Sequence, residues 1–375
     1  MAGIYIHIPF CKQRCTYCDF YTQVAPQLIP DLVDALIKEM HLRKEYLSNE
    51  IVETIYFGGG TPSLLTKNQF ASIFETIFKL FNVSKHPEIT FEANPDDLNL
   101  DFFNDITSLA FNRISIGIQS FDDLSLKKLN RRHDGKQAIE AVKNAQSFGF
   151  KNISIDLIYG LPDQTIENWL EQLKMAFELN VQHISIYGLT YETGTRLYKQ
   201  RERGEINVVS DDEMISMYQI MLKAMNENGF EAYEISNFAL AGFRSQHNSS
   251  YWKLKTYLGL GPSAHSFKGT VRQWNISSTK KYIQAINAQE NCFESENLSI
   301  NDRYNDYIMI SLRTVEGIDT KYIQDNFGEN YYTFCMSNAL KYIDSKKLVL
   351  RNSRLVLSLE GIHISNLIIS DLMII

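Results

Sequence analysis

The chain has 375 residues, of which 44% are hydrophobic and 22% are charged, values typical of an ordinary globular protein with a large core. Its formal net charge of −7 argues against a general nucleic-acid binder, which would carry a basic patch or stripe. No apolar run approaches the roughly 20 residues needed to span a bilayer, and the first expected strand leaves no room for a signal or transit peptide.

From the amino terminus, short apolar runs alternate with amphipathic segments. Residues 4–8 alternate β-branched residues with Tyr5 and His7, which is typical of a short strand. Further strands are expected at 51–57, 88–93, 113–118, 153–159 and 183–189, with helices at 27–47, 66–81, 98–109, 135–149 and 165–179. This alternation predicts an α/β fold with a parallel sheet. A complete eightfold barrel typically needs about 250 residues, so six units ending near residue 190 predict an open, partial (β/α)6 barrel.

The regular alternation stops at about residue 195. Residues 195–228 are expected to be helical and 232–237 to form a strand, while the mixed composition of 238–275 predicts a functional loop region. Helices return after 279, followed by a hairpin at 347–350 and 354–359 and an apolar final helix. We therefore expect three parts: a barrel over 1–235, an extension over 236–278, and a small C-terminal domain, mainly helical and winged-helix-like, over 279–375.

Three of the five cysteines, Cys11, Cys15 and Cys18, follow the first strand with C-x3-C-x2-C spacing. Pro9 ends that strand, so the thiols are expected on a loop at its carboxyl end. An iron–sulfur cube normally takes four cysteines, and three would leave one iron open to a non-protein ligand. Zinc with His7 as fourth ligand, and purely structural thiols, are the alternatives. The other two cysteines are far apart, which indicates a reduced, cytosolic setting without a disulfide framework.

Polar residues recur where the predicted strands end, which is the edge at which such barrels carry out their chemistry. Glycines let a backbone approach a ligand closely, and a charged residue inside an apolar run requires a partner or a ligand. Each residue alone has a structural explanation, but their shared edge indicates a binding site. They are Gly59, Gly60, Thr61, Glu92, Gln119, Arg131 and Asp156.

The cysteine pattern is similar to that of the radical S-adenosylmethionine (SAM) superfamily. Over roughly residues 4–270, the segments YIHIPFC, FGGGTPS, GIQSF and DLIYGLP resemble the oxygen-independent coproporphyrinogen III oxidases and their relatives. The resemblance implies a [4Fe–4S] cluster on Cys11, Cys15 and Cys18, with SAM chelating the fourth iron and yielding a 5′-deoxyadenosyl radical on reduction. It implies that Gln119, Arg131 and Asp156 lie at a second SAM or substrate position. The full implied SAM set is Tyr5, Tyr17, Gly59, Gly60, Thr61, Glu92, Gln119, Arg131 and Asp156.

Two departures separate this chain from the oxidases and move it toward the haem chaperone branch of the family. The oxidases carry a fourth cysteine two residues after the third, where this chain has Phe20. They also have a longer segment before the first strand, whereas here only four residues precede Tyr5.

A third feature favours the same branch. Residues 247–252, HNSSYW, resemble the HNxxYW motif associated with haem binding there. The resemblance implies that His247, Asn248, Tyr251 and Trp252 bind haem, since imidazole ligates haem iron and the aromatic rings can lie flat against the porphyrin. The alternative is a loop histidine that hydrogen-bonds locally. His265, in the following glycine loop, is a second candidate ligand.

Two functions therefore remain. The first is a haem chaperone that holds a cluster and SAM and delivers haem to acceptor proteins, membrane-bound respiratory enzymes among them. The second is a radical SAM enzyme that decarboxylates coproporphyrinogen III. Phe20 and the HNSSYW segment favour the first, and the retained SAM residues keep the second open, so whether the chain is an enzyme stays undecided. We expect a cytoplasmic protein without nucleic-acid partners, with room for a peripheral contact at the inner membrane face and for a homodimer.

Overall fold

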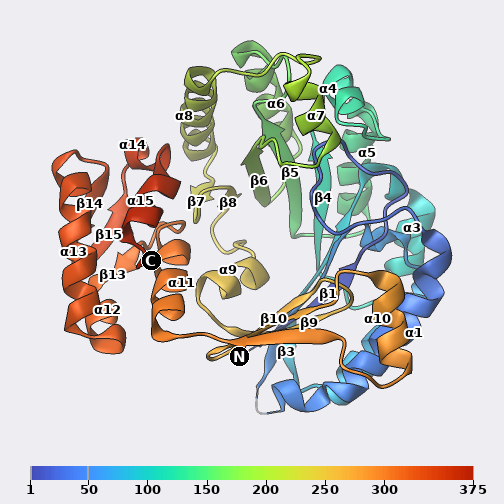
Figure 1. The fold of residues 1–375 in the computed structure, drawn as a ribbon. Coiled ribbons are helices and arrows are strands. Elements are labelled where there is room, and N and C mark those ends of the chain that lie inside the picture. Colours follow the sequence, from blue (N-terminus) through green and yellow to red (C-terminus); the bar gives the residue numbers. More distant parts are fainter. Residues whose placement is uncertain (1, 49, 375) are drawn as a thin grey trace.

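A single twelve-stranded sheet dominates the computed structural model, which describes residues 2–48 and 50–374 (Figure 1). Its strand order is β12-β11-β10-β9-β1-β2-β3-β4-β5-β6-β8-β7, and it is open between β12 and β7. The parallel part comprises β9 (Thr256–Leu260), β1 (Ala2–Ile8), β2 (Val52–Gly59), β3 (Val83–Ala93), β4 (Arg113–Gln119), β5 (Ile153–Tyr159) and β6 (His183–Gly188). The expected partial barrel of six βα units is therefore present.

Helices cover the outer face of this curved sheet (Figure 1). They are α1 (Ile29–Leu42), α2 (Lys67–Leu80), α3 (Leu100–Ile106), α5 (Gly135–Ser147), α6 (Ile166–Glu178), α8 (Asp211–Glu227) and α10 (Thr279–Asn287). Two short helices, α4 (Asp123–Lys128) and α7 (Arg196–Glu202), follow β4 and β6 at the carboxyl ends of the strands, where Leu197 packs with Leu129 and Leu161. Strand alternation sorts the side chains between the two faces. Ile4, Ile6 and Ile8 of β1 belong to the hydrophobic core under the helices, whereas Tyr5 and His7 project into the barrel. The barrel interior is thus lined with aromatic and polar groups.

The prediction of a loop region over 238–275 was wrong. This segment contains a helix, α9 (Gln246–Trp252), and the strands β9, β10 (His265–Lys268) and β11 (Val271–Asn275). Strand β9 pairs in parallel with β1, so the sheet continues past its first strand. The predicted strand at 232–237 is also interrupted, forming β7 (Glu231–Ala232) and β8 (Asn237–Ala239). Short strands without clear periodicity form here because neighbouring strands supply their hydrogen bonds.

The C-terminal domain has a core of its own, running from Tyr304 to Leu372. Its helices are α11 (Ile300–Ser311), α12 (Thr320–Phe327), α13 (Glu329–Asp344), α14 (Leu359–Ile362) and α15 (Ser365–Leu372). They pack with a small antiparallel sheet of β13 (Ile318–Asp319), β15 (Arg354–Leu357) and β14 (Leu348–Arg351), which includes the expected hairpin. Residues of α10 pack on the barrel core, and β12 (Phe293–Asn297) completes the large sheet, so the domain boundary lies near 298, not at 279.

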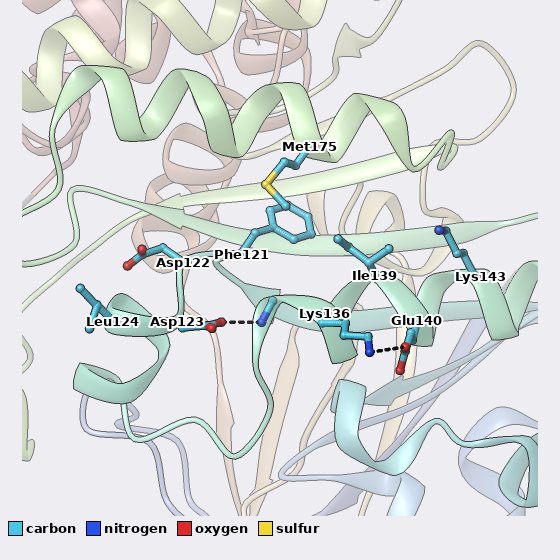
Figure 2. A pocket seen from close by; sticks show the side chains of 10 residues that line it. Phe121, Asp122, Asp123, Leu124, Lys136, Ile139, Glu140, Lys143 and Met175 are labelled. Carbon is cyan, nitrogen blue, oxygen red and sulfur yellow. Dashed lines mark hydrogen bonds and ion pairs between the residues drawn. The ribbon is translucent and has the colours of Figure 1, made fainter.

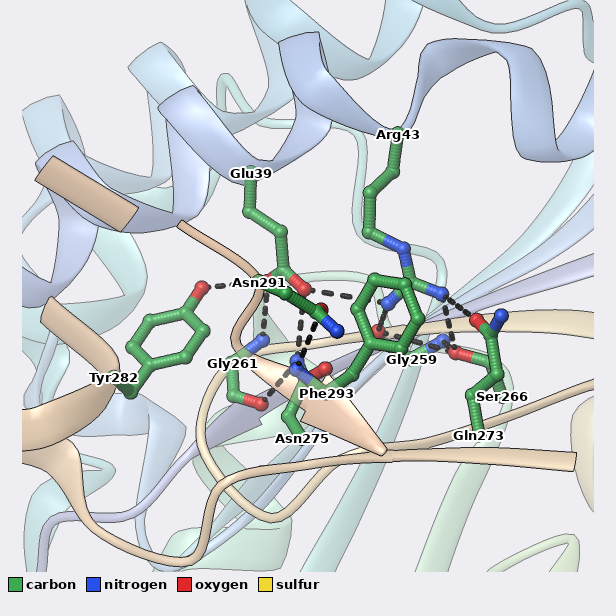
Figure 3. A network of polar contacts seen from close by, with 10 residues as sticks. All are labelled: Glu39, Arg43, Gly259, Gly261, Ser266, Gln273, Asn275, Tyr282, Asn291 and Phe293. Atoms are coloured by element: carbon green, nitrogen blue, oxygen red, sulfur yellow. Dashed lines mark hydrogen bonds and ion pairs between the residues drawn. The ribbon is translucent and has the colours of Figure 1, made fainter. Parts of the chain in front are cut away.

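A buried carboxylate holds the extension onto the barrel (Figure 3). Glu39 of α1 is fully buried and accepts hydrogen bonds from the Gly261 amide (2.9 Å) and the Tyr282 hydroxyl (2.5 Å). It also accepts from Asn275 Nδ2 (2.8 Å) and Arg43 Nη1 (3.3 Å). One side chain of the first helix therefore ties together the β9–β10 loop, β11 and α10. In the part of the chain that the structure describes, no helix is both long and apolar enough to cross a membrane.

Candidate functional site

The three clustered cysteines lie on a loop that begins where β1 ends. The two sides of the loop are joined by Cys11 N–H to Gln23 O (3.0 Å) and Gln23 N–H to Pro9 O (2.8 Å). Lys12 within the loop donates to Asp97 at 2.5 Å, which fixes the loop against the end of the third unit. All three thiols are half-buried. The loop is thus a closed, anchored structure that presents its cysteines at the carboxyl ends of the strands.

A pocket of about 540 Å³ opens at this edge of the barrel. The structure brings together there the residues that the sequence placed at the strand ends. It is lined by Cys11, Cys15, Cys18, Tyr17, Gly59, Gly60, Thr61, Glu92, Gln119, Arg131 and Asp156. Tyr5 is the exception among the predicted SAM residues, because it lies deeper in the barrel, where its hydroxyl is 3.0 Å from His7 Nδ1.

The glycines at the end of β2 allow the cysteine loop to lie close to that strand. A Cβ on Gly60 would lie 2.6 Å from the Phe10 carbonyl oxygen and 2.8 Å from that of Ile8. Gly59 has a φ of +104°, which side-chain-bearing residues rarely adopt. Gln119 also has a positive φ, +69°, at a register shift between β4 and β5. Such backbone conformations are common where a ligand must be approached.

Two half-buried carboxyl groups face the pocket. Glu92 accepts hydrogen bonds from the Tyr56 hydroxyl (2.8 Å) and the Gly59 amide (3.0 Å), and burial raises its pKa to about 7. Asp156 accepts from Ser115 Oγ at 3.3 Å, and burial raises its pKa to about 6. A bound cation would stabilise both charged forms. The pocket is therefore suited to a positively charged ligand, such as an ammonium or a sulfonium.

Arg131 links the cysteine loop to the strand ends. Its guanidinium donates to Cys15 Sγ (3.3 Å), Asn94 Oδ1 (2.6 Å) and the Gly117 carbonyl (2.5 Å), while its Nε is buried without a partner. Asn94 in turn donates to Thr61 Oγ1 at 3.0 Å. Sequence reasoning missed Asn94, although it lies two residues after Glu92 at the same strand end. A cation beside a cysteine sulfur favours the thiolate form that iron requires.

The donor set fits an iron–sulfur cluster better than zinc. His7, the proposed fourth zinc ligand, is buried, with Nε2 3.1 Å from the Tyr21 carbonyl and Nδ1 facing the Tyr5 hydroxyl. The carbonyl can only accept, so Nε2 carries the proton and the Nδ1 lone pair accepts from Tyr5. Among the described residues, no three His, Cys, Asp or Glu side chains converge as ligands of one ion do. Three thiolates that bind separate irons of a cube lie farther apart than three ligands of a single metal ion. The lack of such a convergence among the described residues is therefore compatible with a cluster and unfavourable for zinc.

The HNSSYW segment forms helix α9, which lies against β1 and β2 at the opposite end of the barrel interior. His247 is only 2% exposed, and its ring stacks on Tyr56 with centroids 5.0 Å apart. Its Nδ1 lies 2.7 Å from Thr54 Oγ1 and its Nε2 2.9 Å from the Tyr251 hydroxyl. Burial lowers the pKa of His247 to about 3, so the ring is neutral. Both nitrogens are occupied, as the locally hydrogen-bonded alternative requires, and this arrangement leaves none for haem iron.

The remaining haem candidates do not face one common point. Tyr251 is oriented toward β9, with its ring 4.7 Å from that of Tyr257. Asn248 is half-buried, and Trp252 lines a cleft beside the C-terminal domain. His265 is exposed on β10, 6.4 Å from the Trp274 ring. The structure therefore does not gather the predicted haem residues around one point.

A second depression, of about 570 Å³, lies on the outer helical layer between α4, α5 and α6 (Figure 2). Within it Asp123 accepts a hydrogen bond from the Gly135 amide (2.8 Å), and Lys136 pairs with Glu140 at 3.8 Å. None of the predicted site residues lines it, and it is separated from the strand ends by the sheet. Its lining includes Phe121, Asp122, Leu124, Ile139, Lys143 and Met175.

Comparison with known proteins agrees with this geometry. Residues 5–194 match the Radical SAM superfamily, and residues 298–364 match the HemN C-terminal domain. The chain is 32% identical to the heme chaperone HemW of Bacillus subtilis (strain 168), over 88% of each protein. The chain belongs to the HemW family of radical SAM proteins. Another HemW relative, from Lactococcus lactis subsp. lactis (strain IL1403), is 32% identical over 96% of this chain and 94% of that protein.

The fold of this HemW-family chain is also found in a solved structure. The coproporphyrinogen III oxidase HemN from Escherichia coli, a radical SAM enzyme, superposes with a TM-score of 0.86 over 99% of this chain and 90% of its own. The two are 22% identical, so this likeness concerns the fold alone. It confirms the predicted partial radical SAM barrel with a helical C-terminal region.

Proposed function

We propose that this protein is a haem chaperone that binds a [4Fe–4S] cluster, SAM and haem, and delivers haem to acceptor proteins. One observation carries the proposal: the HNSSYW segment is intact in a chain that has Phe20 in place of the oxidases' fourth cysteine. Phe20 is 67% exposed and lines the pocket mouth, where it offers no sulfur ligand. The relatives named heme chaperone, similar over most of their length, support the same function.

The proposed roles of the pocket residues follow from their chemistry. Cys11, Cys15 and Cys18 would hold three irons of the cluster, which supplies one-electron chemistry to SAM at the fourth. Glu92, held by Tyr56 and Gly59, would accept a hydrogen bond from the amino group of SAM and favour its positive charge. The other lining residues would complete the SAM pocket, with Gln119, Arg131 and Asp156 at a second position. Residues of the 247–252 segment would form the haem site.

The proposal also covers the location of the protein and its partners. We place the protein in the cytoplasm, with membrane-bound respiratory enzymes among the haem acceptors and no nucleic-acid partner. A peripheral contact with the membrane and a homodimer are both compatible with this function.

The second candidate function is coproporphyrinogen III oxidase activity, which the retained pocket carboxylates Glu92 and Asp156 favour.

The two functions can be separated by experiment. We expect the cluster-loaded protein to bind haem at a 1:1 ratio and to leave coproporphyrinogen III unchanged during anaerobic incubation with SAM and a reductant. Absorbance titration with haem and chromatographic analysis of the porphyrinogen products would measure both. Decarboxylation over many turnovers would overturn the chaperone proposal, and the absence of haem binding would remove its basis.

Glu92 provides a test of the SAM site. Its pKa of about 7 lies above the ordinary value of 4.5, so the ligand-free pocket holds a proton at lower pH. If a cationic ligand requires the carboxylate, SAM affinity should increase about tenfold for each unit by which the pH is raised toward that pKa. Above the pKa the affinity should be constant. Glu92→Gln should lower the affinity at pH 7.5 by about tenfold or more and remove this pH dependence, because it removes the charge.

Calorimetric titration of SAM into the anaerobic, cluster-loaded protein between pH 6 and pH 7.5 would measure this effect. The iron content of Glu92→Gln should equal that of the wild type, since Glu92 would serve SAM and not the cluster. Glu140→Gln, on the outer helical layer, is the matched control and should change neither quantity. Unchanged SAM affinity in Glu92→Gln would make Glu92 a structural residue.

A further inference from the structure

A cleft of about 450 Å³ lies between α9 and the C-terminal domain. This is within the range of about 300–1,000 Å³ typical of small-molecule and cofactor pockets. Its barrel wall includes Ser249, Trp252 and Lys253, and its opposite wall includes Tyr307 and Tyr322 of the C-terminal domain. Figure 1 shows α9 lying between the large sheet and that domain. The cleft therefore borders the same helix that carries the HNSSYW residues.

Helix α9 presents two different faces. His247 faces the barrel interior, hydrogen-bonded to Thr54 and Tyr251 and stacked on Tyr56. Trp252 faces the cleft, and its Nε1 is buried without a hydrogen-bond partner. A buried donor without a partner costs free energy that a ligand acceptor would recover. Of the two faces, only the Trp252 face combines open volume with an unused polar group.

The charges of the cleft suit an anionic ligand. The lining holds four cationic side chains against three carboxylates, although the whole chain has a net charge of −7. Among the described residues, Lys253 makes no salt bridge and is exposed, so its ammonium group is available to a ligand. Arg354 pairs with Asp319 at 3.1 Å, and Arg244 with Glu316 at 3.3 Å. The lining charges are Arg244, Lys253, Lys255, Arg354, Glu53, Glu316 and Asp319.

Flat aromatic groups lie on both walls. Trp252 stands on one side, and on the other Tyr307 and Tyr322 lie with ring centroids 4.6 Å apart at an interplanar angle of 30°. Aromatic faces bind large, flat apolar molecules, and cationic side chains bind carboxylates. A planar macrocycle that carries carboxylate groups combines both properties.

We propose that haem lies in this cleft, against the Trp252 face of α9, and not on the His247 face. This inference rests on the proposed haem chaperone function and assigns its binding site. Among the described residues that line the cleft there is no histidine. Recognition would therefore depend on the macrocycle and its carboxylates instead of a histidine–iron bond, and His247 would be a positioning residue that holds α9 against the barrel.

Titration of the full-length, cluster-loaded protein with haemin and with metal-free protoporphyrin IX would test this. We expect the two dissociation constants to agree within about threefold, because the proposed recognition uses the flat macrocycle and its carboxylates, which both ligands share. Trp252→Ala and Tyr322→Ala, on opposite walls, should each weaken both ligands by about tenfold, as truncation of a central aromatic contact does. Lys253→Gln should weaken both and reduce their salt dependence. Trp274→Ala, on β11 outside the cleft, is the matched control and should bind as the wild type does.

The outcomes separate this inference from the proposed function. If the wild type binds haemin far more tightly than protoporphyrin IX, if His247→Gln removes that difference, and if Trp252→Ala and Tyr322→Ala bind normally, the cleft is not the site, although the chaperone proposal stands. If the wild type binds neither porphyrin, both proposals fail. Thermal denaturation and iron content of each variant would identify any loss of affinity that arises from unfolding.

Discussion

Replacing any one of Cys11, Cys15 and Cys18 by serine is expected to abolish the iron–sulfur cluster. Anaerobically purified wild-type protein should contain about four iron ions per chain and should be brown, and each variant should lose both the iron and the colour. Burial raises the pKa of the Cys11 and Cys18 thiols, so a metal must stabilise the thiolate forms. A serine hydroxyl is far less acidic than a thiol and cannot replace a thiolate on iron. Iron and acid-labile sulfide analysis, with the visible absorption spectrum, would measure the loss.

Cys292→Ala is the matched control for this experiment. Cys292 is buried in the core beside α10 and lies outside the cluster pocket, so its removal should leave the iron content unchanged. Stoichiometric zinc without acid-labile sulfide in the wild-type protein would contradict the cluster assignment and restore the zinc interpretation.

Glu39→Ala is expected to cause a large loss of stability, because Glu39 of α1 is the buried carboxylate that holds the extension onto the barrel. The change would leave the buried guanidinium of Arg43 without its carboxylate, and the donors of Asn275, Tyr282 and Gly261 without their acceptor (Figure 3). Breaking a buried ion pair by removing one partner typically costs about 3–5 kcal/mol. Urea unfolding, followed by circular dichroism, should show a markedly lower midpoint.

Lys174→Ala is the control for Glu39→Ala. Lys174 is exposed and pairs with Glu178 at 3.9 Å on the surface of α6, a contact that contributes little. Its unfolding midpoint should stay at the wild-type value. A Glu39→Ala midpoint equal to that of the wild type would show that the extension is held by apolar packing alone.

The barrel could be predicted from the sequence because the pattern that indicates each strand lies within a few consecutive residues. Ile4, Ile6 and Ile8 alternate with Tyr5 and His7, and this period of two marks a strand whose two faces meet different surroundings. Because the carboxyl ends of parallel strands meet at one edge of the sheet, polar residues at those ends are brought together however the helices pack. This is why Glu92, Gln119 and Asp156, which are far apart in the sequence, could be assigned to one pocket.

The extension was not predictable, because its order depends on distant partners. Residues 256–260 form a strand only by pairing with β1, and the short α9 is held by contacts that its own sequence does not reveal. Glu88, for example, accepts a hydrogen bond from the His247 amide at 2.9 Å, although 159 positions separate the two residues. A motif names the residue types but not the side of a helix on which each one lies. The direction of the His247 ring therefore required the structure.

The position of β1 between β2 and β9 has a consequence for biosynthesis. During translation one edge of β1 stays unpaired until the ribosome has made residues 256–260, because β9 supplies the hydrogen bonds for that edge. Pairings between segments so far apart form slowly, and an exposed strand edge invites association with other nascent chains. The cysteine loop follows directly from β1, so we expect the loop to reach its final conformation only after most of the chain has left the ribosome. Cluster insertion would then be a late, largely post-translational event.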